Sequence, residues 1–223
     1  MVANIKFYEK ANKAQNRETV IFVEGDDDAS FLETLLENVN ADPAKVGIVS
    51  VGGNAKFYSE LQTFTTKNPS FTQRHTKRFA IVCDADDNPH EVEKKINTSL
   101  QNVSKDRIAS GEWVAGKGGI AIGLFVMPRT GFTGDLEKLC LDTVCGNTIE
   151  AAAENFIAAA ENTAAQNKTP LHGSRHKRKA QVFLAGTPGE LCRGAGRGFR
   201  NGLFNAKHEA LQPLMDFLAV VSK

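Results

Sequence analysis

Long apolar runs are missing from the chain of 223 residues. No stretch approaches the roughly 18 to 20 apolar residues that span a bilayer, and the opening segment MVANIKFYEK lacks the apolar centre of a secretion signal. Cysteine is scarce too: Cys83, Cys140, Cys145 and Cys192 form no C-x-x-C pair, which excludes a disulfide scaffold and predicts reduced thiols. We therefore expect a cytoplasmic protein that does not associate with membranes.

An excess of charge of either sign is also absent. The chain has 27 Lys and Arg against 26 Asp and Glu, a net charge of +1, so any nucleic acid must be bound by a local basic patch. Apolar residues make up 41% and charged residues 24% of the chain, which excludes a disordered or collagen-like protein.

Short apolar segments alternate with helical patterns. Phe31, Leu32, Leu35 and Leu36 recur at helical spacing between the first two apolar segments, and the acids at 26–28 suit the start of that helix. Four strands are predicted, at 19–23, 46–51, 78–83 and 119–127. Helices are predicted at 27–39, around Phe57 to Phe64, from Pro89, at 136–144 and at 150–166. This alternation predicts a doubly wound α/β fold, a Rossmann-like parallel sheet with helices on both faces.

The C-terminal part differs in composition. A basic stretch at 174–179 and an apolar QVFLA run precede a Gly-rich segment at 186–202, predicted to be a flexible loop, and a closing helix is predicted near 207–221. We expect a catalytic core at 1–148 and a mainly helical, Gly-rich extension at 149–223 that packs on the core.

Acidic residues follow two of the predicted strands. Glu24 ends the first, and Asp84 and Asp86 end the third. Ligands bind at the carboxyl ends of the strands in such sheets, and carboxylates gathered there repel one another unless a divalent cation shares them. Oxygen ligands without nearby His or Cys favour Mg²⁺ or Mn²⁺. On an extended turn Asp84 and Asp86 point the same way, so both reach one metal.

These motifs resemble a known superfamily. VEGDDDASFL at 23–32, with IVCDADDN about 60 residues later, is similar to the Toprim domain of primases, topoisomerases, small maturation ribonucleases and OLD-type nucleases. The resemblance implies that Glu24 is a general acid/base or metal ligand and that Asp84 and Asp86 hold a catalytic metal. Within Toprim proteins the pattern is most like the OLD-type branch, which implies a second metal at Asp28 and Glu137, with Asp135 as an alternative to Glu137.

The later motifs extend the likeness over nearly the whole chain. GLFVMPRTGFTGDLEKL, HKRKAQVFLAG and PGELCRG are similar to small stand-alone Toprim-like proteins related to OLD nucleases. OLD proteins also carry an ATPase domain, but no G-x-x-x-x-G-K-[ST] motif occurs here, so an ATPase partner would be a separate chain.

The resemblance implies phosphodiester hydrolysis of DNA or RNA. Two metals about 4 Å apart would clamp the scissile group, and Lys177, or Lys179 one step away, would neutralise charge on the phosphate. Arg175, Lys177, Arg178 and Lys179 are candidate nucleic-acid contacts, although such a run is also typical of a solvated helix face.

Several residues keep a structural interpretation. Asp26 and Asp27 are expected to act only as helix-capping acids, and Asp28 suits a first-turn helix charge as well as a metal ligand. Gly173 and Ser174 disfavour a helical zinc site at His172 and His176. The arginines of the Gly-rich segment are interpreted as a solvated loop in preference to a phosphate clamp.

The sequence thus predicts a Mg²⁺- or Mn²⁺-dependent nuclease with Glu24 and Lys177 as catalytic residues. The alternative is a metal- or nucleic-acid-binding regulatory module without cleavage, as a partner of a separate ATPase in a phage-defence-like system. A phosphatase is disfavoured, since its D-x-D usually follows the first strand. A homodimer is left open.

Overall fold

The computed structural model describes residues 7–9, 17–68, 71, 75–188 and 193–221. These residues form a six-stranded sheet in the order β1-β3-β2-β4-β6-β5. The neighbouring strands are parallel except β5, which runs antiparallel to β6. The strands are β1 (Tyr8–Glu9), β2 (Thr19–Val23), β3 (Val46–Ser50), β4 (Arg78–Asp84), β5 (Glu112–Ala115) and β6 (Ala121–Met127). The prediction of a Rossmann-like α/β fold is confirmed.

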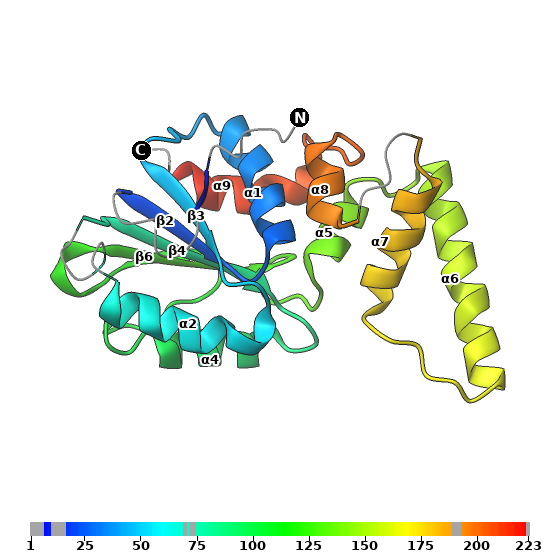
Figure 1. Ribbon diagram of the computed structural model, residues 1–223, viewed down its shortest axis with the longest axis horizontal. Coiled ribbons are helices and arrows are strands. Elements are labelled where there is room, and N and C mark those ends of the chain that lie inside the picture. Colours follow the sequence, from blue (N-terminus) through cyan, green and yellow to red (C-terminus); the bar gives the residue numbers. More distant parts are fainter. Residues whose placement is uncertain (1–6, 10–16, 69–70, 72–74, 189–192, 222–223) are drawn as a thin grey trace.

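Helices cover both faces of this sheet (Figure 1). Helix α1 (Asp26–Asn38) lies on one face, and α2 (Asn54–Lys67) and α4 (Pro89–Ser99) lie on the other. From β2 the chain passes through α1 to β3 on one side of β2, and α2 then carries it to β4 on the opposite side. The strand order reverses at β2 and β4, and such a switch point is where open α/β sheets bind ligands at their carboxyl ends.

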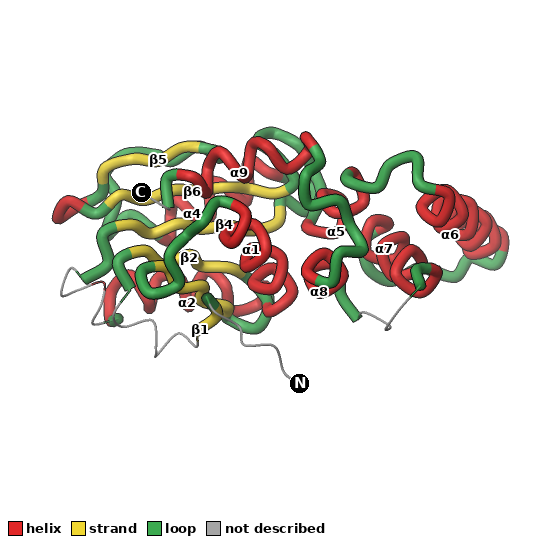
Figure 2. Tube along the Cα trace, turned by 90° about the horizontal axis from the view of Figure 1, so that it is seen from above, coloured by secondary structure: helices red, strands yellow, loops and turns green. Residues whose placement is uncertain are grey.

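The C-terminal helices complete the core on the α1 face. They are α5 (Leu136–Asp142), α6 (Thr148–Gln166), α7 (Arg175–Gly186), α8 (Ala195–Arg200) and α9 (Gln212–Ala219), with a short 3₁₀ turn at Glu209–Leu211 before α9. Another 3₁₀ turn, Lys117–Gly119, connects β5 to β6. The rings of Phe31 and Phe199 lie 4.7 Å apart, and Phe217 stacks on Trp113 at 5.0 Å. Figure 2 shows α6 and α7 projecting at one end of the molecule, beside α5 and α8. No helix in these described ranges is long and apolar enough to cross a membrane.

The prediction of a loop throughout 186–202 is wrong for Ala195–Arg200, which form α8. Glycine permits this helix to pack closely: a side chain at Gly196 would collide with the backbone of Asp27, and one at Gly198 would lie 2.6 Å from Leu184. The QVFLA run belongs to α7, and the closing helix is confined to α9 after the 3₁₀ turn. Cys83, Cys140 and Cys145 carry free thiols, whereas Cys192 lies outside the described residues.

Candidate metal centre

A cavity of about 230 Å³ lies at the carboxyl ends of β2 and β4, at the switch point. It contains each acid predicted to bind metal, together with Lys177. Its lining consists of Glu24, Gly25, Asp27, Asp28, Gly53, Asp84, Asp86, Leu136, Glu137 and Lys177. Residues from five segments of the chain therefore converge at one place, and most of those with charged side chains are acidic.

Glu24 is placed by the pairing of two neighbouring strands. It follows β2 directly, and Phe22 of β2 pairs in register with Ile81 of β4. The backbone N–H of Asp84 donates a hydrogen bond to Glu24 Oε1 at 3.3 Å, and Gly53 N–H donates to the Glu24 carbonyl at 2.8 Å. The Glu24 carboxylate is thus held against the end of β4, half-buried.

Asp28 lies in the first turn of α1 and turns back towards the strand end. Asp28 Oδ2 accepts a hydrogen bond from Gly25 N–H at 2.8 Å, and Asp28 is only 9% exposed. Gly25 is the N-cap residue, so the prediction of an acidic N-cap at 26–28 is wrong, although Asp28 contributes to the cap through its bond from Gly25 N–H. Asp28 is a first-turn acid and also lines the cavity, so its position is compatible with both interpretations from the sequence.

The D-x-D pair adopts a bent turn and not the extended one predicted. Asp86 has a φ of 47°, in the left-handed region, and its carbonyl accepts a hydrogen bond from Gly134 N–H at 2.8 Å. Asp84 Oδ1 accepts from Leu136 N–H at 2.9 Å, which ties the D-x-D turn to the start of α5. Both aspartates still line the cavity.

The structure distinguishes Glu137 from its alternative Asp135. Glu137 lines the cavity, whereas Asp135 is 2% exposed and caps α5 by accepting from Lys138 N–H at 2.9 Å. The other oxygen of Asp135 accepts the Ser174 hydroxyl at 2.7 Å, and His176 Nδ1 lies 3.5 Å from the carboxylate. This geometry favours Glu137 as the ligand and gives Asp135 the role of holding α7 against α5.

Lys177 reaches the acids because of that connection. Ser174 caps α7 by accepting a hydrogen bond from Lys177 N–H at 3.1 Å, while its own hydroxyl donates to Asp135. Burial lowers the pKa of Lys177, but attraction to Glu137, Asp84 and other acids outweighs this and raises it above its usual value. The ammonium is therefore a fixed positive charge at the cavity.

Burial and mutual repulsion raise the pKa values of four acids in the cavity. The pKa of Asp28 is raised to about 7, mainly by burial and next by repulsion from Glu24. The pKa of Glu137 is also raised to about 7, mainly by burial and next by repulsion from Asp135. The pKa of Asp84 lies well above its usual value, mainly through burial, and the pKa of Glu24 is also raised by burial. The uncompensated negative charge makes proton uptake favourable, and a divalent cation would compensate it instead.

The other basic residues of α7 do not line the cavity. Arg175 pairs with Glu154, and with Glu161 at 3.2 Å, and Arg178 pairs with Glu161 at 2.9 Å. Lys179 pairs with Glu150, and with Glu154 at 2.8 Å. These three side chains bind α7 to α6. Lys177 alone of the four predicted nucleic-acid contacts faces the acids.

Asp27 is a residue whose role the sequence did not reveal. Its carboxylate accepts hydrogen bonds from Gly196 N–H at 3.0 Å and Arg197 N–H at 3.1 Å, across about 170 positions of the chain. Asp27 therefore joins α8 to α1 at the edge of the cavity. Gly194 and Gly196 were the sequence signal for this close contact, since a side chain at either position would collide with Asp27.

The side chains of the cavity would suit Mg²⁺ or Mn²⁺, because the available donor atoms are carboxylate oxygens and no His or Cys lines the cavity. Across the described residues, no three His, Cys, Asp or Glu side chains form a ready-made metal-binding group. Glu24, Asp28 and Asp84 each bind a backbone N–H at the N-termini of α1 and α5 or at the end of β4. Each of these carboxylates uses one oxygen for that bond, which leaves its second oxygen to face a cation.

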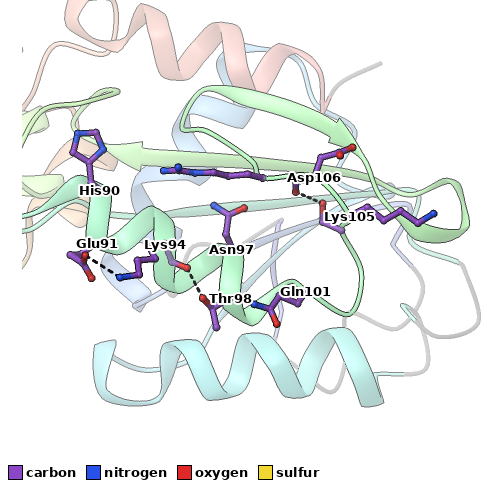
Figure 3. A pocket seen from close by; sticks show the side chains of 10 residues that line it. His90, Glu91, Lys94, Asn97, Thr98, Gln101, Lys105 and Asp106 are labelled. Atoms are coloured by element: carbon purple, nitrogen blue, oxygen red, sulfur yellow. Dashed lines mark hydrogen bonds and ion pairs between the residues drawn. The ribbon is translucent and has the colours of Figure 1, made fainter.

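A larger cavity, of about 500 Å³, lies along α4 (Figure 3). Its charged side chains have mixed signs: Lys94 points to Glu91, 3.6 Å away, and Arg107 lies 3.5 Å from the buried Glu93. It lacks a convergence of acids comparable to that at the strand ends, so the smaller cavity is the candidate metal centre.

A comparison with protein families gives a match over almost the whole chain. Residues 18–222 match the family described as "Protein of unknown function (DUF3226)", and the chain belongs to that family. No curated protein and no solved structure matches the chain.

Proposed function

We propose that this protein is a cytoplasmic, Mg²⁺- or Mn²⁺-dependent nuclease that hydrolyses phosphodiester bonds of DNA or RNA at a Toprim-type site. The observation that carries the proposal is the convergence of Glu24, Asp28, Asp84, Asp86 and Glu137 with Lys177 in one cavity at the switch point. The order of Glu24-Gly25 after β2 and D-x-D after β4 supports the Toprim assignment.

Each side chain has a role that its surroundings support. Glu24 has a raised pKa, so it is suited to accept and return a proton during hydrolysis. Lys177 carries a fixed positive charge that would neutralise the negative charge developing on a phosphate. Asp28, Asp84, Asp86 and Glu137 would hold the cation, with Glu24 able to contribute. The bound cation would activate water and stabilise the leaving oxygen.

The test compares cleavage by the wild type, Glu24→Gln and a matched control, Glu60→Gln, which removes an exposed carboxylate on α2. Single-stranded and double-stranded DNA and RNA are incubated with Mg²⁺, Mn²⁺ or EDTA. We expect the wild type and Glu60→Gln to cut in a metal-dependent way and Glu24→Gln to lose at least about a hundredfold in rate.

Equal cutting by Glu24→Gln and the wild type would refute the assignment and indicate a contaminating nuclease. Binding of Mn²⁺ and nucleic acid by the wild type without any cutting would favour the alternative, a regulatory module that acts with a separate ATPase.

A further inference from the structure

The loop between β6 and α5, residues 128–135, borders the cavity at both ends. At its start, Met127 of β6 pairs in register with Asp84 of β4. At its end, Leu136 and Glu137 of α5 line the cavity. A substrate whose phosphate lies among the acids would therefore lie next to both ends of this loop.

Hydrogen bonds hold the loop on both sides of its tip. The Thr130 hydroxyl donates to the Ser110 carbonyl at 3.0 Å, and Gly134 N–H donates to the Asp86 carbonyl at 2.8 Å. Within the tip, Phe132 N–H donates to the Arg129 carbonyl at 3.1 Å. The tip is thus fixed relative to the D-x-D turn, as a preformed recognition surface requires.

The tip displays an aromatic ring and a cation in contact. Phe132 is 49% exposed, whereas the rings of the core, such as Phe79 and Phe125, are buried. The Arg129 guanidinium carbon lies 3.7 Å from the centroid of the Phe132 ring. Arg129 makes no ion pair with any residue that the structure describes, so its charge is available to a ligand.

We infer that Phe132 and Arg129 form a platform on which an unpaired nucleobase stacks beside the scissile phosphate, so that the preferred substrate is single-stranded or locally unpaired nucleic acid. The inference rests on the proposed nuclease function and adds the class of substrate. Exposed aromatic rings bind single strands because every base offers a flat face, and arginine strengthens the stack while attracting phosphate. Bases inside a duplex have both faces covered and cannot use such a ring.

Tryptophan fluorescence provides a test that does not depend on cleavage. The chain contains one tryptophan, Trp113, which stacks on Phe217, so Phe132→Trp adds a reporter at the platform. Wild type and Phe132→Trp are titrated with short single-stranded DNA, single-stranded RNA and blunt duplex DNA, with Ca²⁺ replacing Mg²⁺. We expect saturable quenching of the added tryptophan by single strands and little by the duplex.

Affinity measurements on further variants separate stacking from a general effect. We expect Phe132→Ala to bind single strands about tenfold more weakly, Phe132→Tyr to bind like the wild type, and Arg129→Ala to reduce the salt dependence by about one phosphate contact. The control is Phe156→Ala, which removes another exposed ring, 61% exposed, on α6. Its affinity should not change.

Each outcome has a definite meaning. Quenching in Ca²⁺ together with no cleavage of the same strands in Mg²⁺ or Mn²⁺ would support the platform and refute the nuclease. Cleavage with unchanged binding by Phe132→Ala, or equal binding of duplex and single strands, would refute the platform and leave the nuclease standing. No binding of any oligonucleotide would refute both. Tighter binding of RNA than DNA would support the platform and indicate a contact with the 2′-hydroxyl.

Discussion

Replacement of Asp28 by asparagine should make the metal-free protein more stable. Burial and repulsion from Glu24 raise the pKa of Asp28 from 3.8 to about 7. Each tenfold change in proton affinity corresponds to about 1.4 kcal/mol, so the ionised carboxylate lowers the free energy of unfolding by about 4 kcal/mol at most. The amide oxygen can still accept from Gly25 N–H, but without charge, and we expect a net gain of about 2 to 3 kcal/mol at pH 8.

The gain should depend on pH in a defined direction. Asp28 ionises near its ordinary pKa in the unfolded chain but only near pH 7 in the folded protein, so the wild type loses stability as pH rises between these values. The difference between Asp28→Asn and the wild type should be near zero around pH 3, grow through this window and level off above pH 7. Urea unfolding followed by circular dichroism at several pH values measures it.

A matched control and a metal titration complete this test. Asp26 is exposed in the same turn and does not line the cavity, so Asp26→Asn should bring no gain. Mn²⁺ at pH 8 should stabilise the wild type more than Asp28→Asn. In the wild type the cation would neutralise the buried Asp28 carboxylate, whereas the variant has no such charge to neutralise. The reasoning is refuted if Asp28→Asn is no more stable than the wild type at pH 8, or if its advantage persists unchanged at pH 3.

Three further predictions concern the same site. Asp84→Asn should weaken Mn²⁺ binding at least about tenfold, and equal affinity would remove Asp84 from the ligands. Because the pKa of Asp84 is raised, calorimetry of the wild type in two buffers at pH 6 should show proton release when Mn²⁺ binds. Gly196→Ala should destabilise the protein by about 2 kcal/mol or more through collision with Asp27, and thermal unfolding at the wild-type midpoint would contradict this. Ser174→Ala should lower the free energy of unfolding by about 1 kcal/mol and lower the pKa of Lys177 towards its ordinary value. NMR of ¹³C-dimethylated lysines measures that pKa, and an unchanged Lys177 titration would show that the Ser174 cap does not position Lys177.

The central strands were predictable because local signals and tertiary context agree there. Thr19–Val23 is buried along its whole length, and the run at 78–83 is extended by Asp84 alone. β5 was missed because an edge strand of four residues, EWVA, is partly exposed and has no apolar run to mark it. The bend at Asp86 was missed since a positive φ in an aspartate depends on the bridge to Gly134.

The convergence of the acids followed from topology, because strand ends at a switch point must meet. The contacts that complete the cavity could not be predicted in this way. Ser174 bonds to Asp135 across 39 positions and Gly196 to Asp27 across 169, and neither pair has a local pattern that names its partner. The ion pairs of Arg175 were hidden for the same reason: a basic run has the same sequence whether it faces solvent or a glutamate-bearing helix.

These distant contacts change how the C-terminal extension should be understood. The segment at 149–223 supplies Lys177 to the cavity, and it also buries Phe31 against Phe199 on the α1 face. One hydrophobic cluster includes Phe31 and Phe125 from the first 148 residues and Phe199 and others from the extension. A fragment that ends at residue 148 would therefore lose part of its core together with the positive charge at the acids. Stability and the proposed chemistry depend on the same helices, so the extension is a part of the site and not an appendage to it.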